Sequence, residues 1–134
     1  MLELNDKLFI NHGRTRVCHE HPSDSSLVVK TPFSDDEKGY LSNANEYKAY
    51  YNLIGHHPRL SCISHCRGYI ETNRGKGLLC ESIRDYNGTI SKSIWDIILY
   101  KEDCNLDYII QVTADFCEYL QSHDIFIFDI NLKN

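Results

Sequence analysis

The sequence predicts an α+β fold, in which a five-stranded antiparallel sheet with one inserted helix is followed by a linker and then by helices. Two observations support this class. Short runs of β-branched and aromatic residues, separated by turn residues, occupy most of residues 1–83, and one helical period interrupts them after the third run. Beyond residue 90 the spacing of apolar residues is mainly helical.

Three strands near the N-terminus are expected to form an antiparallel meander. The first covers residues 8–10 and ends at the turn Asn11-His12-Gly13. The second covers residues 14–19, and the third covers residues 26–30 and is closed by Pro32. Because each run is short and bounded by turn residues, neighbouring strands are expected to pair directly.

A helix is predicted from Asn43, after an acidic connector at residues 34–37. Apolar and aromatic side chains recur there at three- and four-residue steps, at Ala44, Tyr47, Tyr51 and Ile54. A second stripe beside them contains Glu46, Tyr50 and Leu53. Gly55 and Pro58 are expected to end the helix.

The rest of the chain is predicted to contain a hairpin, a linker and a helical segment. Residues 66–72 and 77–83 are expected to pair around a turn at residues 73–76, which completes the five strands. Residues 84–90 are polar and turn-rich and indicate a linker between residues 1–83 and residues 91–134. Ser93 is expected to cap a short helix, and a longer helix begins near Asp107. The apolar run at residues 125–128 predicts one further buried strand.

Composition and charge exclude several classes of protein. The 134 residues are enough for one core, and the net charge of −5 disfavours a nucleic-acid partner. No apolar run is long enough to span a membrane, and the N-terminal residues do not resemble a secretion signal, so a cytoplasmic protein is expected. The six cysteines are therefore expected to be reduced thiols.

Two clusters of cysteine and histidine deserve comparison with zinc sites. One is Cys18-His19-Glu20-His21, which lies on a predicted strand where neighbouring side chains point to opposite faces. The other is Cys62-Ile63-Ser64-His65-Cys66. Neither cluster has the paired Cys-x₂-Cys spacing of structural zinc sites, so core and surface roles are favoured over metal binding.

The C-terminal stretch places a carboxylate and an amide at a spacing that serves phosphoryl transfer. Asp129 follows the apolar run, and Asn134 lies five positions later. In a kinase catalytic loop of the form D-x-x-x-x-N, the carboxylate accepts the proton of the attacking hydroxyl and the amide oxygen helps to hold Mg²⁺. The pattern alone is weakly specific, because an Asp and an Asn at this spacing are common.

The order of elements, with a lysine on the third strand and a glutamate on the inserted helix, resembles a protein-kinase-like N-lobe followed by the start of a C-lobe. More closely, the chain resembles the bacterial YrbL family of PhoP regulatory network proteins. The segment Gly13-Arg14-Thr15-Arg16-Val17-Cys18, followed by His21-Pro22, carries the most specific part of this resemblance. Further matching stretches are residues 46–51, 67–72 and 120–134.

The resemblance implies that ATP and Mg²⁺ are the cofactors, and it assigns catalytic roles to Lys30, Glu46 and Asp129. Lys30 would pair with the α- and β-phosphates of ATP, and Glu46 would hold that lysine in place. Asp129 would be the catalytic base, and Asn134 would be a metal ligand. An exposed strand lysine and a solvated helix glutamate are the ordinary alternatives for the first two residues.

The resemblance also places a phosphate-binding loop and a hinge. Gly13 is the one glycine left of the usual three, and Arg14 or Arg16 would supply the charge that backbone amides normally share. A simple polar hairpin turn is the alternative there. Glu81 and Ile83 would present backbone groups to adenine at the hinge.

The sequence ends at Asn134, before the Asp-Phe-Gly segment that supplies the second metal ligand of a kinase. We therefore expect a truncated chain with little or no phosphotransfer of its own. Three alternatives stay open: a shortened phosphotransferase, a non-catalytic regulatory or binding module in a two-component regulatory network, and an unrelated α+β protein. Exposed helix faces in the C-terminal part would favour a protein partner or self-association.

Overall fold

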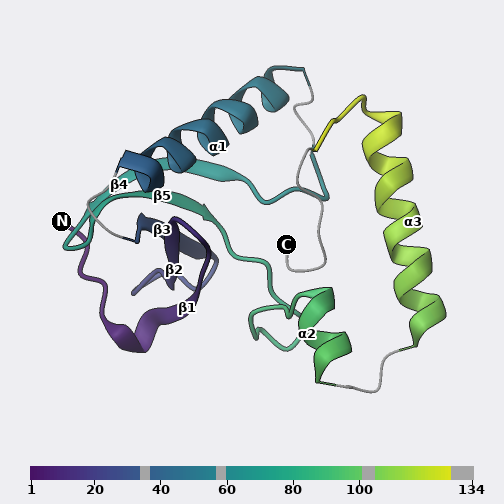
Figure 1. Cartoon of the computed structure of the whole chain (residues 1–134), viewed down its shortest axis with the longest axis horizontal. Helices are drawn as coiled ribbons and strands as arrows, with labels where there is room; N and C mark the ends of the chain where they lie inside the picture. The colour runs from purple at the N-terminus through teal and green to yellow at the C-terminus, as the bar shows by residue number, and fades with distance from the viewer. Residues whose placement is uncertain (34–36, 57–59, 101–104, 128–134) are drawn as a thin grey trace. The chain divides into compact units, whose positions relative to one another are not determined.

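The computed structural model describes residues 1–33, 37–56, 60–100 and 105–127 (Figure 1). The chain divides into two compact units, Met1–Ile83 and Arg84–Asn134. Within the described residues, the first unit contains a short 3₁₀ helix, all five strands and the longest helix, and the second contains two helices. Their assignment as the lobes of a kinase-like fold stays a prediction.

The first unit is built on one five-stranded antiparallel sheet. Its strands are β1 (Phe9–His12), β2 (Arg16–Glu20), β3 (Leu27–Pro32), β4 (Cys66–Thr72) and β5 (Gly75–Glu81). Their order in the sheet is β1-β2-β3-β5-β4, and every neighbouring pair is antiparallel. The predicted sheet, including the hairpin β4–β5, is therefore confirmed. The bounds of β3 extend through Pro32, two residues beyond the predicted end.

The long helix α1 (Glu37–His56) covers one face of this sheet (Figure 1). Directly opposed residues share a face, and the register opposes Lys30 to Cys18 and to Leu78. The hydrophobic core on this face contains Val28, Cys66, Leu78 and Cys80, with Tyr47 and Tyr50 packed against it. The core thus takes one tyrosine from each of the two predicted stripes of the helix, whereas Ala44 and Tyr51 of the first stripe are exposed.

The opposite face of the sheet contains His19, Val29 and Thr31, which alternate with the residues under α1 and are buried. The N-terminal segment is held at the β4–β5 turn by Asn73. The Asn73 side-chain oxygen accepts from the Leu4 amide at 2.8 Å, and its amide nitrogen donates to the Leu4 carbonyl at 3.1 Å. This double contact fixes Leu4 as a buried residue of the first unit.

The helix α1 begins at Glu37, six residues before its predicted start at Asn43. The apolar spacing did not predict residues 37–42 as helix, and this stretch contains Gly39, a poor helix former. In the structure Gly39 is buried, and a Cβ there would lie 2.7 Å from the Pro32 Cβ and 2.8 Å from the Thr15 carbonyl oxygen. Glycine thus allows the start of the helix to approach the sheet closely.

The second unit contains α2 (Ile94–Leu99) and α3 (Leu106–Ser122). The predicted cap is confirmed, because the Ser93 hydroxyl accepts from the Asp96 amide at 3.2 Å. The predicted linker is a hydrogen-bonded loop, in which the Asp85 amide donates to the Thr89 carbonyl at 2.9 Å.

The apolar side chains of α3 are largely exposed, and Leu106, Tyr108 and Ile110 each expose more than half of their surface. The predicted strand at residues 125–128 is not formed at residues 125–127, which pair with no strand, while Phe128 lies outside the described residues. A strand needs a hydrogen-bonding neighbour, and none is present in the described part of this unit. No helix in the described ranges is long and apolar enough to cross a membrane.

Candidate functional site

The candidate site lies between the third strand and the inserted helix of the first unit. Lys30 lies on the face of β3 that α1 covers, and Glu46 lies on α1. Asn43 and Tyr50 lie three and four residues from Glu46 along the helix, so all three side chains share one helix face. Since Asn43 is buried and Tyr50 packs on the core, Glu46 points to the sheet rather than to solvent.

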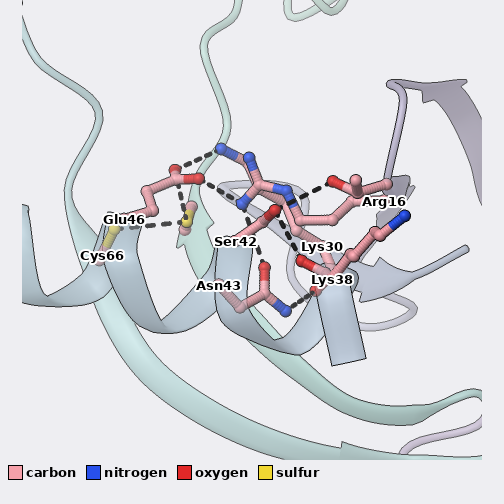
Figure 2. Close-up of polar contacts among 9 residues, drawn as sticks. Arg16, Lys30, Lys38, Ser42, Asn43, Glu46 and Cys66 are labelled. Carbon is pink, nitrogen blue, oxygen red and sulfur yellow. Dashed lines mark hydrogen bonds and ion pairs between the residues drawn. The ribbon is translucent and has the colours of Figure 1, made fainter. Parts of the chain in front are cut away.

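Glu46 accepts from two basic side chains, one at each carboxylate oxygen (Figure 2). The Lys30 Nζ lies 2.6 Å from Glu46 Oε1, and the Arg16 Nη1 contacts Glu46 Oε2. The three side chains are 26% to 29% exposed, which places the cluster between a surface ion pair and a buried one. Lys30 and Glu46, which sequence reasoning paired, are thus brought together in space.

Asn43 joins the same cluster to the backbone of the sheet. Its Nδ2 donates to the Lys30 carbonyl at 2.9 Å, and its Oδ1 accepts from Arg16 Nη1 at 3.1 Å. The side chain is 1% exposed and both of its polar atoms are satisfied. Sequence reasoning did not identify Asn43 as a site residue, although its position three residues before Glu46 on one helix face was a usable signal.

Electrostatics keep both members of the Lys30–Glu46 pair charged. Burial opposes each charge, but the neighbouring Glu46 carboxylate more than offsets this effect and raises the pKa of Lys30. The same reasoning holds for Glu46, where burial is outweighed by the Lys30 ammonium and the Arg16 guanidinium, so its pKa is lowered. The pair is therefore ionised across the neutral range.

Two buried thiols lie directly beside Glu46. Cys66 and Cys80 face each other across β4 and β5 with their Sγ atoms 3.6 Å apart, and the Cys80 Sγ lies 4.0 Å from Glu46 Oε1. Sequence reasoning missed this group because its members are far apart in the chain. Within the described residues, neither of the two cysteine–histidine clusters considered above gathers three metal ligands, whereas Glu46, Cys66 and Cys80 do.

The predicted phosphate loop is the turn between β1 and β2. The Gly13 amide donates to the Arg16 carbonyl at 2.8 Å, which closes the turn, and Gly13 and Arg14 are exposed. A second tie comes from Thr15, whose hydroxyl lies 3.0 Å from the hydroxyl of Ser42 on α1. Arg16, which the resemblance offered as a phosphate ligand, instead has its guanidinium on Glu46 and Asn43.

The predicted hinge lies at the end of β5. The Glu81 amide donates to the His65 carbonyl at 2.8 Å, and the Glu81 carbonyl accepts from the Ser64 hydroxyl at 2.8 Å. The Glu81 side chain pairs with Arg67. Both backbone groups of Glu81 therefore have a partner within the chain. Ile83 is exposed, and its contact with adenine stays a prediction.

The two residues of the predicted catalytic loop, Asp129 and Asn134, lie outside the described residues. Their roles as catalytic base and metal ligand stay predictions. What the described structure brings together is one carboxylate, two basic side chains, one amide and two thiols, all on the covered face of a five-stranded sheet. In that arrangement the Lys30 ammonium donates one hydrogen bond to the fixed Glu46 carboxylate. A lysine held in this way can also bind an anion beside the sheet.

The class defined by this fold and cluster is an α+β protein with an ion pair between its third strand and its inserted helix. The chain matches the family described as PhoP regulatory network protein YrbL over residues 2–134, and it therefore belongs to that family. It is 25% identical over 138 aligned positions to the uncharacterized protein YrbL of Escherichia coli strain K12, and equally so to that of Shigella flexneri. These alignments include the whole chain and 64% of each relative, so the chain spans less than two thirds of their length. No solved structure matches the chain.

Proposed function

We propose that residues 1–83 form a nucleotide-binding lobe of the protein-kinase-like type. The observation that carries the proposal is the 2.6 Å contact between Lys30 of β3 and Glu46 of α1, on a sheet ordered β1-β2-β3-β5-β4. In this role the glutamate fixes the lysine ammonium, which then pairs with the α- and β-phosphates of ATP. The lysine ammonium has three N–H donors and donates one of them to Glu46, so it can also donate to a phosphate oxygen.

The chemistry proposed for the whole family member is ATP-dependent phosphotransfer. Asp129 would accept the proton of the attacking hydroxyl, and Asn134 would contribute an amide oxygen to Mg²⁺. The metal would neutralise charge on the β- and γ-phosphates when bound. Kinases also hold Mg²⁺ with an aspartate carboxylate, and this proposal assigns no residue to that role.

The second candidate is a non-catalytic regulatory or binding module, as the family description suggests for a regulatory network. The observation that favours it is the arginine on Glu46. The guanidinium of Arg16 contacts Oε2 while Lys30 contacts Oε1, so the arginine neutralises Glu46 and is itself directed to that carboxylate and not to a phosphate. Gly13 is also the one glycine of the predicted phosphate loop, which leaves less room for backbone amides to approach phosphates. A protein partner or self-association belongs to this second proposal.

Equilibrium binding of ATP to the full chain, with and without Mg²⁺, tests the first proposal. Lys30→Met is expected to reduce ATP affinity at least about tenfold, because it removes a charge-assisted contact to phosphate. Lys7→Met is the matched control, since Lys7 lies in the exposed 3₁₀ helix η1 (Asp6–Leu8) and is expected to leave ATP binding unchanged. Absence of ATP binding by the wild-type chain, together with nucleotide-independent capture of a partner, would favour the module instead.

A further inference from the structure

We propose that Glu46, Cys66 and Cys80 form a binding site for a thiophilic divalent cation, with Zn²⁺ as the ion that fits best. The three side chains come from α1, β4 and β5, and their ligand atoms all lie within 4.8 Å of one another. Carboxylate and thiolate groups are both zinc ligands in proteins. The site does not depend on the proposed nucleotide function, because its ligands are defined by their own positions.

The spacing of the two sulfur atoms matches a tetrahedral metal better than it matches a disulfide. Two thiolates, each about 2.3 Å from a tetrahedral zinc ion, lie about 3.8 Å apart. The observed separation of Cys66 Sγ and Cys80 Sγ is 3.6 Å. A disulfide would require about 2.05 Å. Glu46 Oε1 is 4.0 Å from Cys80 Sγ, within a few tenths of an ångström of what such an ion needs.

The thiols are placed so that metal can replace their protons. Cys66 and Cys80 are 8% and 1% exposed and lie directly opposite each other in the β4–β5 register, so the backbone fixes their separation. Together with Glu46 on α1, they place three ligand atoms within 4.8 Å of one another.

Charge balance also permits a dication among basic residues. With both thiols protonated, Glu46, Lys30 and Arg16 together carry a net charge of about +1 at neutral pH. Binding of Zn²⁺ releases two thiol protons, so two positive charges enter and two leave as H⁺. The net charge of the cluster is unchanged, and no oxidant or reductant takes part.

The ion would compete with Lys30 for one oxygen atom. Glu46 Oε1 accepts from Lys30 Nζ at 2.6 Å and faces Cys80 Sγ, while Oε2 is held by Arg16. A cation on Oε1 therefore repels or displaces the lysine ammonium. Three protein ligands leave a fourth position for solvent, as in other open zinc sites. If Lys30 also serves nucleotide, as proposed above, zinc would weaken that function.

Titration of the reduced, metal-free full chain with Co²⁺ under anaerobic conditions tests the site. We expect one Co²⁺ per chain, with a sulfur-to-cobalt charge-transfer band and the intense visible bands of a tetrahedral ion, both removed by added Zn²⁺. Cys80→Ser should abolish the charge-transfer band. Glu46→Gln should weaken the affinity for Co²⁺ about tenfold or more while the charge-transfer band is preserved. Cys117→Ser is the matched control, because Cys117 is an exposed thiol on α3.

Two further measurements keep the proposal testable if a core variant fails to fold. On the wild-type chain, Zn²⁺ should protect Cys66 and Cys80 from alkylation, as mapped by mass spectrometry, and leave Cys62 reactive. Lys30→Met should raise Co²⁺ affinity severalfold, because it removes the competing cation. A charge-transfer band that survives Cys80→Ser, or zinc protection confined to the exposed cysteines, would overturn the proposed site.

Discussion

The coupling between Lys30 and Glu46 is the first quantity that the structure predicts. The perturbation is a double-mutant cycle on the free energy of unfolding, with Lys30→Met, Glu46→Gln and the double variant. In Lys30→Met the contact between Arg16 and Glu46 Oε2 is retained, so the cycle reports mainly on the Oε1 contact. The two variants also remove charge without leaving a large cavity, because methionine and glutamine nearly conserve side-chain volume.

The magnitude follows from distance and exposure. The two side chains are 28% and 29% exposed and their charged atoms are 2.6 Å apart. Exposed ion pairs contribute up to about 1 kcal/mol, whereas hydrogen bonds to charged groups contribute about 1.5–3 kcal/mol. We therefore expect a coupling free energy of about 1–2 kcal/mol at neutral pH and low salt.

Urea denaturation of the four proteins, followed by circular dichroism, provides the assay. The matched control is the ion pair between Arg74 and Asp6, which has the same 2.6 Å separation but an Asp6 side chain that is 94% exposed. Its cycle, with Arg74→Met and Asp6→Asn, should show coupling near zero because solvent screens the pair. Equal coupling in the two cycles, or less than about 0.5 kcal/mol for Lys30–Glu46, would show that partial burial does not strengthen this ion pair.

Three further predictions concern buried residues of the first unit. Gly39→Ala should destabilise the first unit by about 1–3 kcal/mol despite the better helix propensity of alanine, because its Cβ would meet Pro32 at 2.7 Å. A Cβ at Gly55 would have no atom within 4 Å, so Gly55→Ala should be neutral or stabilising in the same urea titration. A lower free energy of unfolding in both variants would contradict the steric explanation. Asn43→Ala should lower the free energy of unfolding by about 2–3 kcal/mol through its two buried hydrogen bonds, and a loss below about 0.5 kcal/mol would count against them. Burial lowers the pKa of His19 from 6.5, and Arg74 acts in the same direction. The unfolded chain therefore takes up the proton first, and the free energy of unfolding should fall as the pH drops below 6.5. His19→Gln should remove that part of the pH dependence, and an unchanged pH dependence would contradict the prediction.

The sheet was predictable because its strands are local features of the sequence. The runs of β-branched residues around Val28 and Val29, and the turn at Asn73, mark strands whatever lies beside them. The start of α1 was not predictable in this way, since Gly39 is unfavourable in a helix and its helical conformation goes with close packing against Pro32. A tertiary contact overrides local propensity at that position.

In the candidate site, some residues were likewise identifiable from the sequence and others depended on tertiary contacts. Lys30 and Glu46 were identified through a family resemblance, and the structure places them in contact. Cys66 and Cys80 look like ordinary small hydrophobes in the sequence, because the strand register that opposes them follows from the pairing of β4 with β5. Asn43 was missed because the sequence does not distinguish a buried asparagine from an exposed one. Its burial becomes evident from its hydrogen bonds to Arg16 and to the Lys30 carbonyl.

The most direct test of the nucleotide-binding proposal is affinity labelling of the full chain with an acyl phosphate derivative of ATP. Such a probe transfers its acyl group to a lysine amine held beside the phosphates, and peptide mass spectrometry identifies the labelled residue. Nucleotide binding through Lys30 predicts labelling at Lys30 that excess ATP blocks, with Lys7 and Lys76 modified weakly and without protection by ATP. Labelling spread over surface lysines, with Lys30 untouched or unprotected, would contradict the proposal that this lobe binds nucleotide through Lys30.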